Sequence, residues 1–308
     1  MKDIALNKFT LSVVIPTYNR PDLVIRAVES VIAERDDTYN KVEIIVVDDN
    51  SSIESPDLSV YQDLIFYRMP VNGGPGPARM KGINLATCSW VLMLDDDDIL
   101  MQGSVRYLAN LLSKLEEDDY PVYQFSTKKV YQVEQIKNNF LLATFDDYMN
   151  KVIIDDLTAV FNRKKFLSTG LQYPDNRVGG EHLLWWKIAE RYGVPSYAHQ
   201  IVSVSDDAHV RLTHFSSQIK NAAHYQELAE MTLKDFGERL CSDYPSEYRR
   251  IQLAYITYSL LNKQSKKARH ILKTARINKI LKVILWIISW LPDYFIKKLF
   301  LFYRNYNG

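Results

Sequence analysis

Cysteine is scarce in this chain of 308 residues, which contains only Cys88 and Cys241. Two cysteines are too few for the disulfide framework that holds many small secreted domains together. The N-terminal segment also lacks the layout of a signal peptide before its first predicted strand. Both absences favour the cytoplasm. Because 47% of the residues are hydrophobic, the chain can still bury one large core or two smaller ones.

A long uninterrupted apolar run is also missing. The most apolar segment, residues 280–304, is broken by Lys282, Pro292, Asp293, Lys297 and Lys298. A membrane-spanning helix needs about 20 predominantly apolar residues. The segment therefore predicts two short interfacial helices, with its aromatic residues near lipid headgroups, namely Trp286, Trp290 and Tyr294. A helical cap on the protein's own core is the alternative.

Acidic residues are nearly absent from the C-terminal part of the chain. Residues 263–308 contain 11 Lys and Arg and one acid, Asp293, which leaves 27 basic and 36 acidic residues in residues 1–262. An acidic body with a basic tail predicts that the tail meets a negatively charged surface. Apolar residues between the charges favour anionic lipid over nucleic acid. We therefore expect an anionic membrane surface, and no nucleic acid, among the partners.

The first hundred residues alternate between strand and helix patterns. The predicted strands are Leu11–Pro16, Val42–Asp48, Leu64–Arg68 and Trp90–Leu94, and the predicted helices are residues 21–33, 78–86 and 99–115. This order predicts an α/β fold with a doubly wound, mixed and mostly parallel sheet. A further helix is predicted from Glu181, and the chain is predicted to be helical beyond Pro245. We expect an α/β domain over residues 1–240 and a helical region over residues 241–308, which is basic and amphipathic from about residue 263.

Four consecutive aspartates, Asp95–Asp98, follow the last of these strands. Adjacent carboxylates repel by about 1–4 kcal/mol per close pair, depending on the local dielectric. An ordered site of this kind therefore calls for a cation. Mg²⁺ and Mn²⁺ prefer oxygen ligands, and Mg²⁺ commonly uses one or two carboxylates with substrate phosphates. The pattern predicts a divalent metal and a phosphorylated ligand at the carboxyl edge of the sheet. A solvated acidic loop or a helix cap is the alternative.

Three further segments place polar residues at the same predicted edge. The segments VVIPTYNR (13–20) and VVDDNSS (46–52) each end a strand, and NGGPGPARMKG (72–82) is a glycine-rich loop that leads into a helix. Taken singly, the first two also fit ordinary turn chemistry, with Asn19 as the N-cap of the helix that Pro21 opens. The order of the segments along the chain is stronger evidence for a functional site than any single segment.

Together with VLMLDDDD (91–98), these segments resemble the donor half of an inverting family two glycosyltransferase with the GT-A fold, which is Rossmann-like. The resemblance covers about residues 9–215 and is to bacterial enzymes of O-antigen and capsular polysaccharide assembly. It implies that residues 1–100 bind a nucleotide-sugar through Mn²⁺ or Mg²⁺ and that residues 101–240 bind the acceptor. By matching position it assigns nucleotide-sugar binding to Pro16, Thr17, Tyr18, Arg20, Asp49, Gly73, Arg79, Asp95 and Asp96.

Individual roles follow from the same resemblance. Thr17 and Tyr18 would lie against the base and ribose, and Asp49 would accept a hydrogen bond from a uracil-type N–H. The implied metal ligands are Asp97 and Asp95. Met80 departs from the family, which often has asparagine after Ala-Arg at this point. The residue types fit these roles, because glycine lets the backbone approach a ligand and arginine pairs with phosphate or stacks on a base.

The acceptor half carries a Gly-acid pair at the start of a helix, within Gly180–Lys187. In the family a carboxylate at such a position takes the proton from the acceptor hydroxyl, which implies Glu181 as the general base. His182 stands where many relatives have aspartate, and it is the second candidate because histidine titrates near neutrality. A favourable charge in the first turn of the helix is the structural alternative for Glu181.

Three other residues are candidates for contacts with the acceptor or the diphosphate. Trp185 follows Glu181 on the predicted helix, although a place in the core is the more favoured interpretation. Arg211 and His214 belong to an R-x-x-H-x-x-S pattern that resembles the segment after the acceptor helix in many relatives. The resemblance implies that this pattern contacts the diphosphate or helps the metal site.

The activity implied is transfer of a hexose, glucose or galactose, from a UDP-sugar to an N-acetylhexosamine on polyprenyl diphosphate, in some relatives with a β-1,3 linkage. An enzyme on the same membrane face as its acceptor gains effective concentration, so we expect peripheral attachment to the cytoplasmic face of the inner membrane. Two alternatives stay open. A nucleotidyltransferase would be expected to show a Gly-rich phosphate loop where this chain has PTYNRP. A non-catalytic membrane-bound scaffold that binds nucleotide-sugar would have no use for Glu181.

Overall fold

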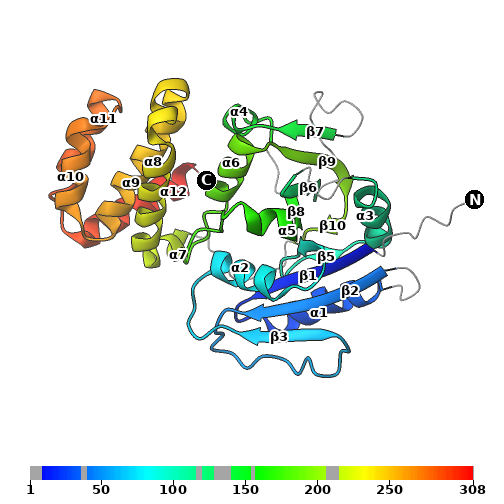
Figure 1. Ribbon diagram of the computed structural model, residues 1–308. Helices are drawn as coiled ribbons and strands as arrows, with labels where there is room; N and C mark the ends of the chain where they lie inside the picture. The colour runs from blue at the N-terminus through cyan, green and yellow to red at the C-terminus, as the bar shows by residue number, and fades with distance from the viewer. Residues whose placement is uncertain are drawn as a thin grey trace, which may run out of the picture. The chain divides into compact units, whose positions relative to one another are not determined.

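The computed structural model describes residues 9–35, 40–115, 120–127, 140–153, 157–205 and 215–307 (Figure 1). The chain divides into two compact units. The first comprises Met1–Asp175 with Gly179–Ala208, and the second comprises Asn176–Val178 with His209–Gly308. Residue 240, near which the sequence predicts a domain boundary, falls inside a helix of the second unit, α8 (Ala222–Asp243). The division into functional domains stays a prediction.

The first unit is built on an eight-stranded sheet with the strand order β3-β2-β1-β4-β8-β6-β9-β7 (Figure 1). Its strands are β1 (Phe9–Thr17), β2 (Asn40–Asp48), β3 (Leu64–Arg68), β4 (Trp90–Met93), β6 (Val122–Ser126), β7 (Phe140–Ala143), β8 (Leu157–Asn162) and β9 (Val194–Gln200). The strands β3, β2, β1 and β4 run parallel, whereas β8 is antiparallel to both β4 and β6. The predicted α/β fold with a mixed sheet is therefore confirmed.

Helices cover both faces of this sheet. They are α1 (Pro21–Ile32), α2 (Pro75–Leu85), α3 (Ser104–Leu112), α4 (Phe145–Met149), α5 (Arg163–Ser168) and α6 (His182–Arg191). Successive residues of a strand point to opposite faces, so β1 contributes Val13 to the core on the α1 side and Val14 to the core on the α2 side. Each fully buried side chain of this size contributes about 1.5–3 kcal/mol to stability. The two cores hold β1 at the centre of the site described below.

Two helix starts differ from the sequence-based expectation. Helix α2 begins at Pro75 rather than at residue 78, because proline is well tolerated at the first helical position. Helix α3 begins at Ser104 rather than at residue 99, because β5 (Ile99–Leu100) pairs with β10 (Val202–Ser203) in a separate antiparallel ribbon. The apolar character of residues 99–100 thus serves a short strand that follows the aspartate run.

The second unit is helical, which confirms the predicted helical C-terminal region. Its helices are α7 (Phe215–Lys220), α8, α9 (Pro245–Leu261), α10 (Ser265–Thr274), α11 (Lys279–Ile288) and α12 (Asp293–Asn307). A separate hydrophobic core holds Ile256 of α9, Leu272 of α10, and Ile296 and Phe300 of α12. No helix in the described ranges is long and apolar enough to cross a membrane. Attachment of this region to a membrane surface stays a prediction.

The contact between α2 and β1 offers a test of the packing. Gly82 lies against Val14, and a Cβ at this position would overlap the Val14 side chain. We expect Gly82→Ala to lower the free energy of unfolding by about 1–3 kcal/mol, because overpacking a buried contact shifts the backbone. Urea denaturation followed by circular dichroism measures the change.

Gly237→Ala on α8 is the matched control for this substitution. The atoms nearest to a Cβ at Gly237 lie 3.9 Å away, which is an ordinary contact. Alanine in a helix interior is more favourable than glycine by about 0.5–1 kcal/mol, so this variant should be slightly stabilised. Equal stability of Gly82→Ala and the wild type would contradict the tight α2–β1 contact.

Candidate active site

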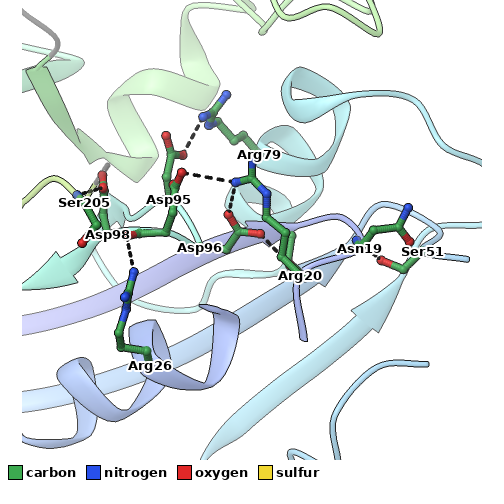
Figure 2. A network of polar contacts seen from close by, with 11 residues as sticks. Asn19, Arg20, Arg26, Ser51, Arg79, Asp95, Asp96, Asp98 and Ser205 are labelled. Carbon is green, nitrogen blue, oxygen red and sulfur yellow. Dashed lines mark hydrogen bonds and ion pairs between the residues drawn. The ribbon is translucent and has the colours of Figure 1, made fainter. Parts of the chain in front are cut away.

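The predicted motifs meet at the carboxyl edge of the large sheet. Thr17 and Asp48 end β1 and β2 at paired positions of the register, and the loop after β4 begins with Leu94, whose N–H donates to the Val14 carbonyl. Because β4 is parallel to β1, Asp95–Asp98 emerge at the same edge. Open α/β sheets bind ligands at this edge. Figure 2 shows the polar contacts around the aspartate run.

Asp96 is the most buried member of the run, with 5% of its side chain exposed. Its carboxylate accepts a hydrogen bond from the Arg20 guanidinium at 2.7 Å (Figure 2). It also accepts one from Thr17 Oγ1 at 2.8 Å. Burial raises the pKa of Asp96 to about 6, although Arg20 and Thr17 act in the opposite direction. Asp96 thus ties the end of β1 to the start of α1. Its contact with a nucleotide-sugar stays a prediction.

Asp97 lies beside the same arginine but is more accessible. An oxygen of its carboxylate is 3.3 Å from the Arg20 guanidinium, and 19% of the side chain is exposed. Its backbone carbonyl accepts a hydrogen bond from the Arg26 guanidinium of α1 at 2.8 Å. Arg20, just before α1, therefore holds the side chain of Asp97, and Arg26, within α1, holds its main chain. Asp97 is the best candidate for a metal ligand.

Asp98 is held on the other side of the loop. It accepts a hydrogen bond from the Ser205 N–H at 3.4 Å (Figure 2). Burial raises the pKa of Asp98 to about 7, and repulsion from Asp95 and Asp97 adds to the effect. Asp98 therefore connects the aspartate loop to the segment after β10.

Arg79 of α2 contacts residues from both the predicted donor side and the predicted acceptor side. Its guanidinium contacts Asp95 at 2.6 Å and also forms a short ion pair with Glu181, a residue 102 positions further along the chain. Arg79 itself is 8% exposed. Burial lowers the pKa of Arg79, but the two carboxylates outweigh it and leave the pKa above its ordinary value. The structure thus brings the predicted base, Glu181, next to two residues predicted to bind the nucleotide-sugar, Arg79 and Asp95.

Tyr173 lies beneath this arginine and was not identified from the sequence. The Arg79 guanidinium carbon is 5.8 Å from the centre of the Tyr173 ring, and burial raises the pKa of the Tyr173 hydroxyl. The next residue, Pro174, approaches α2 so closely that a Cβ at Gly76 would lie 2.5 Å from its carbonyl oxygen. The only sequence signal was therefore Gly76, which allows this approach.

Asp49 anchors the glycine-rich loop. Its two carboxylate oxygens accept hydrogen bonds from the Gly73 N–H at 2.8 Å and the Gly74 N–H at 2.7 Å. Gly74 has a φ of 95°, a conformation that favours glycine. Asp49 is 4% exposed. Each carboxylate oxygen has further acceptor capacity, and the contact with a uracil-type N–H stays a prediction.

Asn19 does not act as the predicted helix cap. The residue that precedes α1 is Arg20, and no side chain caps this helix. Asn19 instead adopts a φ of 57°, and its side-chain carbonyl accepts hydrogen bonds from the N–H groups of Ser52 at 2.7 Å and Ile53 at 3.1 Å. Its own N–H donates to Ser51 Oγ (Figure 2). The polar ends of β1 and β2 are thereby joined.

The other donor-side residues lie along the same strand end. Pro16 is buried within β1, whereas Tyr18 follows the strand with 44% of its surface exposed. An exposed aromatic ring beside a polar sheet edge is available to stack on a planar base. This arrangement supports the predicted role of Tyr18, which remains to be tested.

The acceptor-side residues begin α6. Glu181 occupies the position before the helix and keeps 38% of its side chain exposed, next to Arg79. His182 packs edge-on against Trp186, with ring centres 4.9 Å apart. Trp185 is partly buried against Tyr173, with ring centres 5.8 Å apart. Glu181 is thus the candidate base that Arg79 links to the aspartate run, and Trp185 lies against the core.

Two predicted residues, Arg211 and His214, lie outside the described residues. Within the described ranges, no group of three or more His, Cys, Asp and Glu side chains could hold a metal ion alone. Asp95 and Asp97 nevertheless offer oxygen donors on one loop. Mg²⁺ commonly uses one or two protein carboxylates with substrate phosphates. This donor set therefore fits a divalent cation whose remaining ligands come from a diphosphate.

Similarity to known proteins extends along the chain. The family described as "Glycosyl transferase family 2" matches residues 12–169, about half of the chain. An uncharacterized glycosyltransferase of Rickettsia prowazekii is 34% identical over 114 residues, which are 37% of this chain and 35% of that relative. The chain thus spans only about a third of the length of that protein. A Campylobacter jejuni protein named GalNAc(5)-diNAcBac-PP-undecaprenol beta-1,3-glucosyltransferase is 27% identical, over 94% of this chain and 96% of its own length.

Solved structures show the same architecture. S. aureus TarS 1–349 in complex with UDP-GlcNAc has a TM-score of 0.55 and 15% identity, covering 94% of this chain and 91% of that chain. Mannosyltransferase PcManGT from Pyrobaculum calidifontis in complex with GDP-Man and Mn²⁺ has a TM-score of 0.53 and 17% identity, covering 92% and 86%. Similarity at this level of identity shows the fold alone. The family match and the shared architecture lead to one conclusion: the chain belongs to glycosyl transferase family 2 and has the GT-A fold.

Proposed function

We propose that the protein is a metal-dependent inverting glycosyltransferase. It moves a hexose, glucose or galactose, from a UDP-sugar to an N-acetylhexosamine carried on polyprenyl diphosphate. The observation that carries this proposal is the position of Arg79, whose guanidinium contacts both Asp95 and Glu181. Asp95, which is suited to binding the donor complex, and Glu181, which is suited to proton transfer, thereby pair with the same guanidinium. Donor and acceptor chemistry converge at this point.

The substrate classes rest on the relatives. The Campylobacter jejuni protein, aligned over nearly the whole of both chains, is named for glucosyl transfer in a β-1,3 linkage to an undecaprenol-linked acceptor. We assign the same acceptor class and, as the favoured product, the same linkage to this chain. A role in O-antigen or polysaccharide assembly, at the cytoplasmic face of the inner membrane with peripheral attachment, follows from a lipid-borne acceptor. Membership of the family favours this activity over nucleotidyl transfer.

Asp97 and Asp95 would hold Mn²⁺ or Mg²⁺ together with the diphosphate of the donor. The bound cation would neutralise the charge of the departing UDP. Arg20 keeps Asp97 in place, and Arg79, which lies between Asp95 and Glu181, can pair with a diphosphate oxygen. These residues orient the donor with its anomeric carbon toward Glu181.

Glu181 takes the proton in the displacement. Its carboxylate takes the proton of the acceptor hydroxyl while the hydroxyl oxygen forms a bond to the anomeric carbon. The bond from that carbon to the diphosphate breaks, and UDP leaves with the electron pair. A single displacement inverts the anomeric centre. His182 is the second candidate for this proton transfer, although its ring packs on Trp186.

A turnover assay separates the functional classes. The protein is incubated with Mn²⁺ and radiolabelled UDP-glucose or UDP-galactose, with and without a polyprenyl-diphosphate N-acetylhexosamine. We expect acceptor-dependent movement of label into the lipid product with release of UDP. Nucleotide-sugar binding without label transfer to any such acceptor would contradict the proposal and favour a scaffold. Release of diphosphate from UTP in the presence of a sugar phosphate would indicate a nucleotidyltransferase.

The metal proposal predicts a strong dependence on Asp97. We expect Asp97→Ala to reduce turnover by about 10²-fold or more, because a ligand of the charge-neutralising cation is lost. The fold should persist, since one of four repelling carboxylates is removed. EDTA should abolish wild-type turnover, and added Mn²⁺ should restore it. Asp235→Ala, at an exposed position of α8, is the control and should retain wild-type activity. Full turnover in EDTA would refute the metal assignment.

The proton-transfer proposal predicts a loss in the chemical step alone. Glu181→Gln keeps the size of the side chain but cannot take a proton, so turnover should fall by about 10²- to 10⁴-fold. Binding of UDP with Mn²⁺, measured by calorimetry, should be largely retained. Glu190→Gln, at an exposed position of the same helix, serves as the matched control. If His182→Ala loses more activity than Glu181→Gln, the base is His182.

A further inference from the structure

Helix α11 is apolar yet almost uncovered by the rest of its unit. None of its residues is buried. Ile280 is 72% exposed, and Val283, Ile284, Trp286 and Ile287 are exposed as well. Only Leu285 and Ile288 pack against the core of the second unit. A helix that is apolar on most of its circumference normally lies in a core or a membrane environment, whereas the described part of this unit covers only one side of α11.

Helix α12 continues this surface. It is fastened by Ile296 and Phe300, which are four residues apart and both buried in the core of the second unit. Other large side chains of the same helix face outward, including Tyr294, Phe295 and Leu299. Buried and exposed apolar residues thus lie on different sides of one helix. The exposed side of α12 and the uncovered helix α11 together define what we term the tail surface.

The corner between the two helices is fixed by Arg269 of α10. Its guanidinium donates a hydrogen bond to the Ser289 carbonyl at 2.9 Å and lies 4.1 Å from the centre of a Trp290 ring. Ser289 is buried, whereas Trp290 is 63% exposed. Lys282 adds a second contact, from its ammonium group to the Lys273 carbonyl at 3.1 Å. The tail surface is therefore held in position by contacts within its own unit.

The charges around the tail surface are almost all positive. Residues 263–308 carry 11 Lys and Arg against one acid. Several of the basic residues lie on the three helices that carry or adjoin the surface, including Lys273, Lys279, Lys282, Lys297 and Lys298. Helices that lie in a membrane interface typically carry tryptophan and tyrosine next to lysine. A protein partner with an apolar interface would not require this excess of positive charge.

We propose that the tail surface is a preformed docking site for an anionic lipid bilayer. Ile280, Val283, Ile284 and Ile287 enter the boundary between headgroups and acyl chains. Trp286 and Trp290 lie at headgroup level, and the lysines pair with anionic headgroups. The choice of a membrane as the partner rests in part on the proposed function, because an enzyme with a lipid-linked acceptor benefits from binding the membrane that carries it. The geometry of the surface is independent of that function.

Vesicle binding tests the inference on the full-length protein without substrate. Binding is measured by co-sedimentation with vesicles of phosphatidylcholine containing about 30% phosphatidylglycerol, and with vesicles of phosphatidylcholine alone. We expect at least about tenfold tighter binding to the anionic vesicles at low salt, because each cation near an anionic surface contributes to affinity. Tryptophan fluorescence should shift to shorter wavelength on binding. Equal affinity for the two vesicle types would overturn the proposal.

A pair of identical substitutions locates the surface. Val283→Glu places a charge in the exposed face of α11 and should weaken vesicle binding by at least about tenfold. Val60→Glu makes the same change at another exposed position, 71% exposed in the first unit, and should bind like the wild type. Similar affinities for the two variants would overturn the assignment of the surface.

Two further measurements separate the possible failures. If the wild type ignores vesicles but forms an oligomer that Val283→Glu dissociates, as seen by light scattering, the surface is a contact between copies and the lipid proposal is wrong. The hydrolysis of UDP-glucose in the absence of vesicles reports on the donor site alone. Loss of vesicle binding with donor hydrolysis intact refutes only the docking surface. Vesicle binding without any use of donor leaves the docking surface in place and contradicts the proposed function.

Discussion

The repulsion among four adjacent carboxylates is the constraint on which the site depends. Asp95–Asp98 would repel by about 1–4 kcal/mol per close pair if left uncompensated. Three arginines from different places offset this cost: Arg20 before α1, Arg26 within α1, and Arg79 within α2. Arg20 contacts Asp96 and Asp97, Arg26 contacts the Asp97 carbonyl, and Arg79 contacts Asp95. Burial still raises the pKa of Asp96 and Asp98. A cation at Asp97 would complete the compensation that the arginines begin.

The sequence was sufficient to predict which residues meet at the sheet edge. Parallel strands end on the same side, so motifs that follow β1, β2 and β4 must converge, whatever their separation along the chain. The strong apolar patterns of these strands made their positions clear. Residues that sit directly at a strand end, such as Thr17, Asp49 and Asp95, were therefore located from pattern alone. The same holds for the break at Pro292, because proline cannot continue a helix.

Contacts made by long side chains across the fold could not be predicted in this way. Nothing in the local pattern shows that Arg79 reaches Glu181, that Tyr173 lies beneath it, or that Asn19 binds the segment after β2 instead of capping α1. Strands β7 and β8 are short and lie at antiparallel positions, where the alternation of strand and helix no longer guides the prediction. Tertiary contacts, and not local preference, decide these features.

The ion pair between Arg79 and Glu181 joins residues 102 positions apart. Closing so long a loop costs conformational entropy before the contact returns any stabilisation. We therefore expect this ion pair to form late in folding. During synthesis the strands β1, β2 and β4 can assemble before residue 181 leaves the ribosome, and until then Arg79 has Asp95 but not Glu181 as a carboxylate partner. A chain that stops before residue 181 would thus contain the proposed nucleotide-sugar site without the proposed proton acceptor, and we expect such truncation products to be inert.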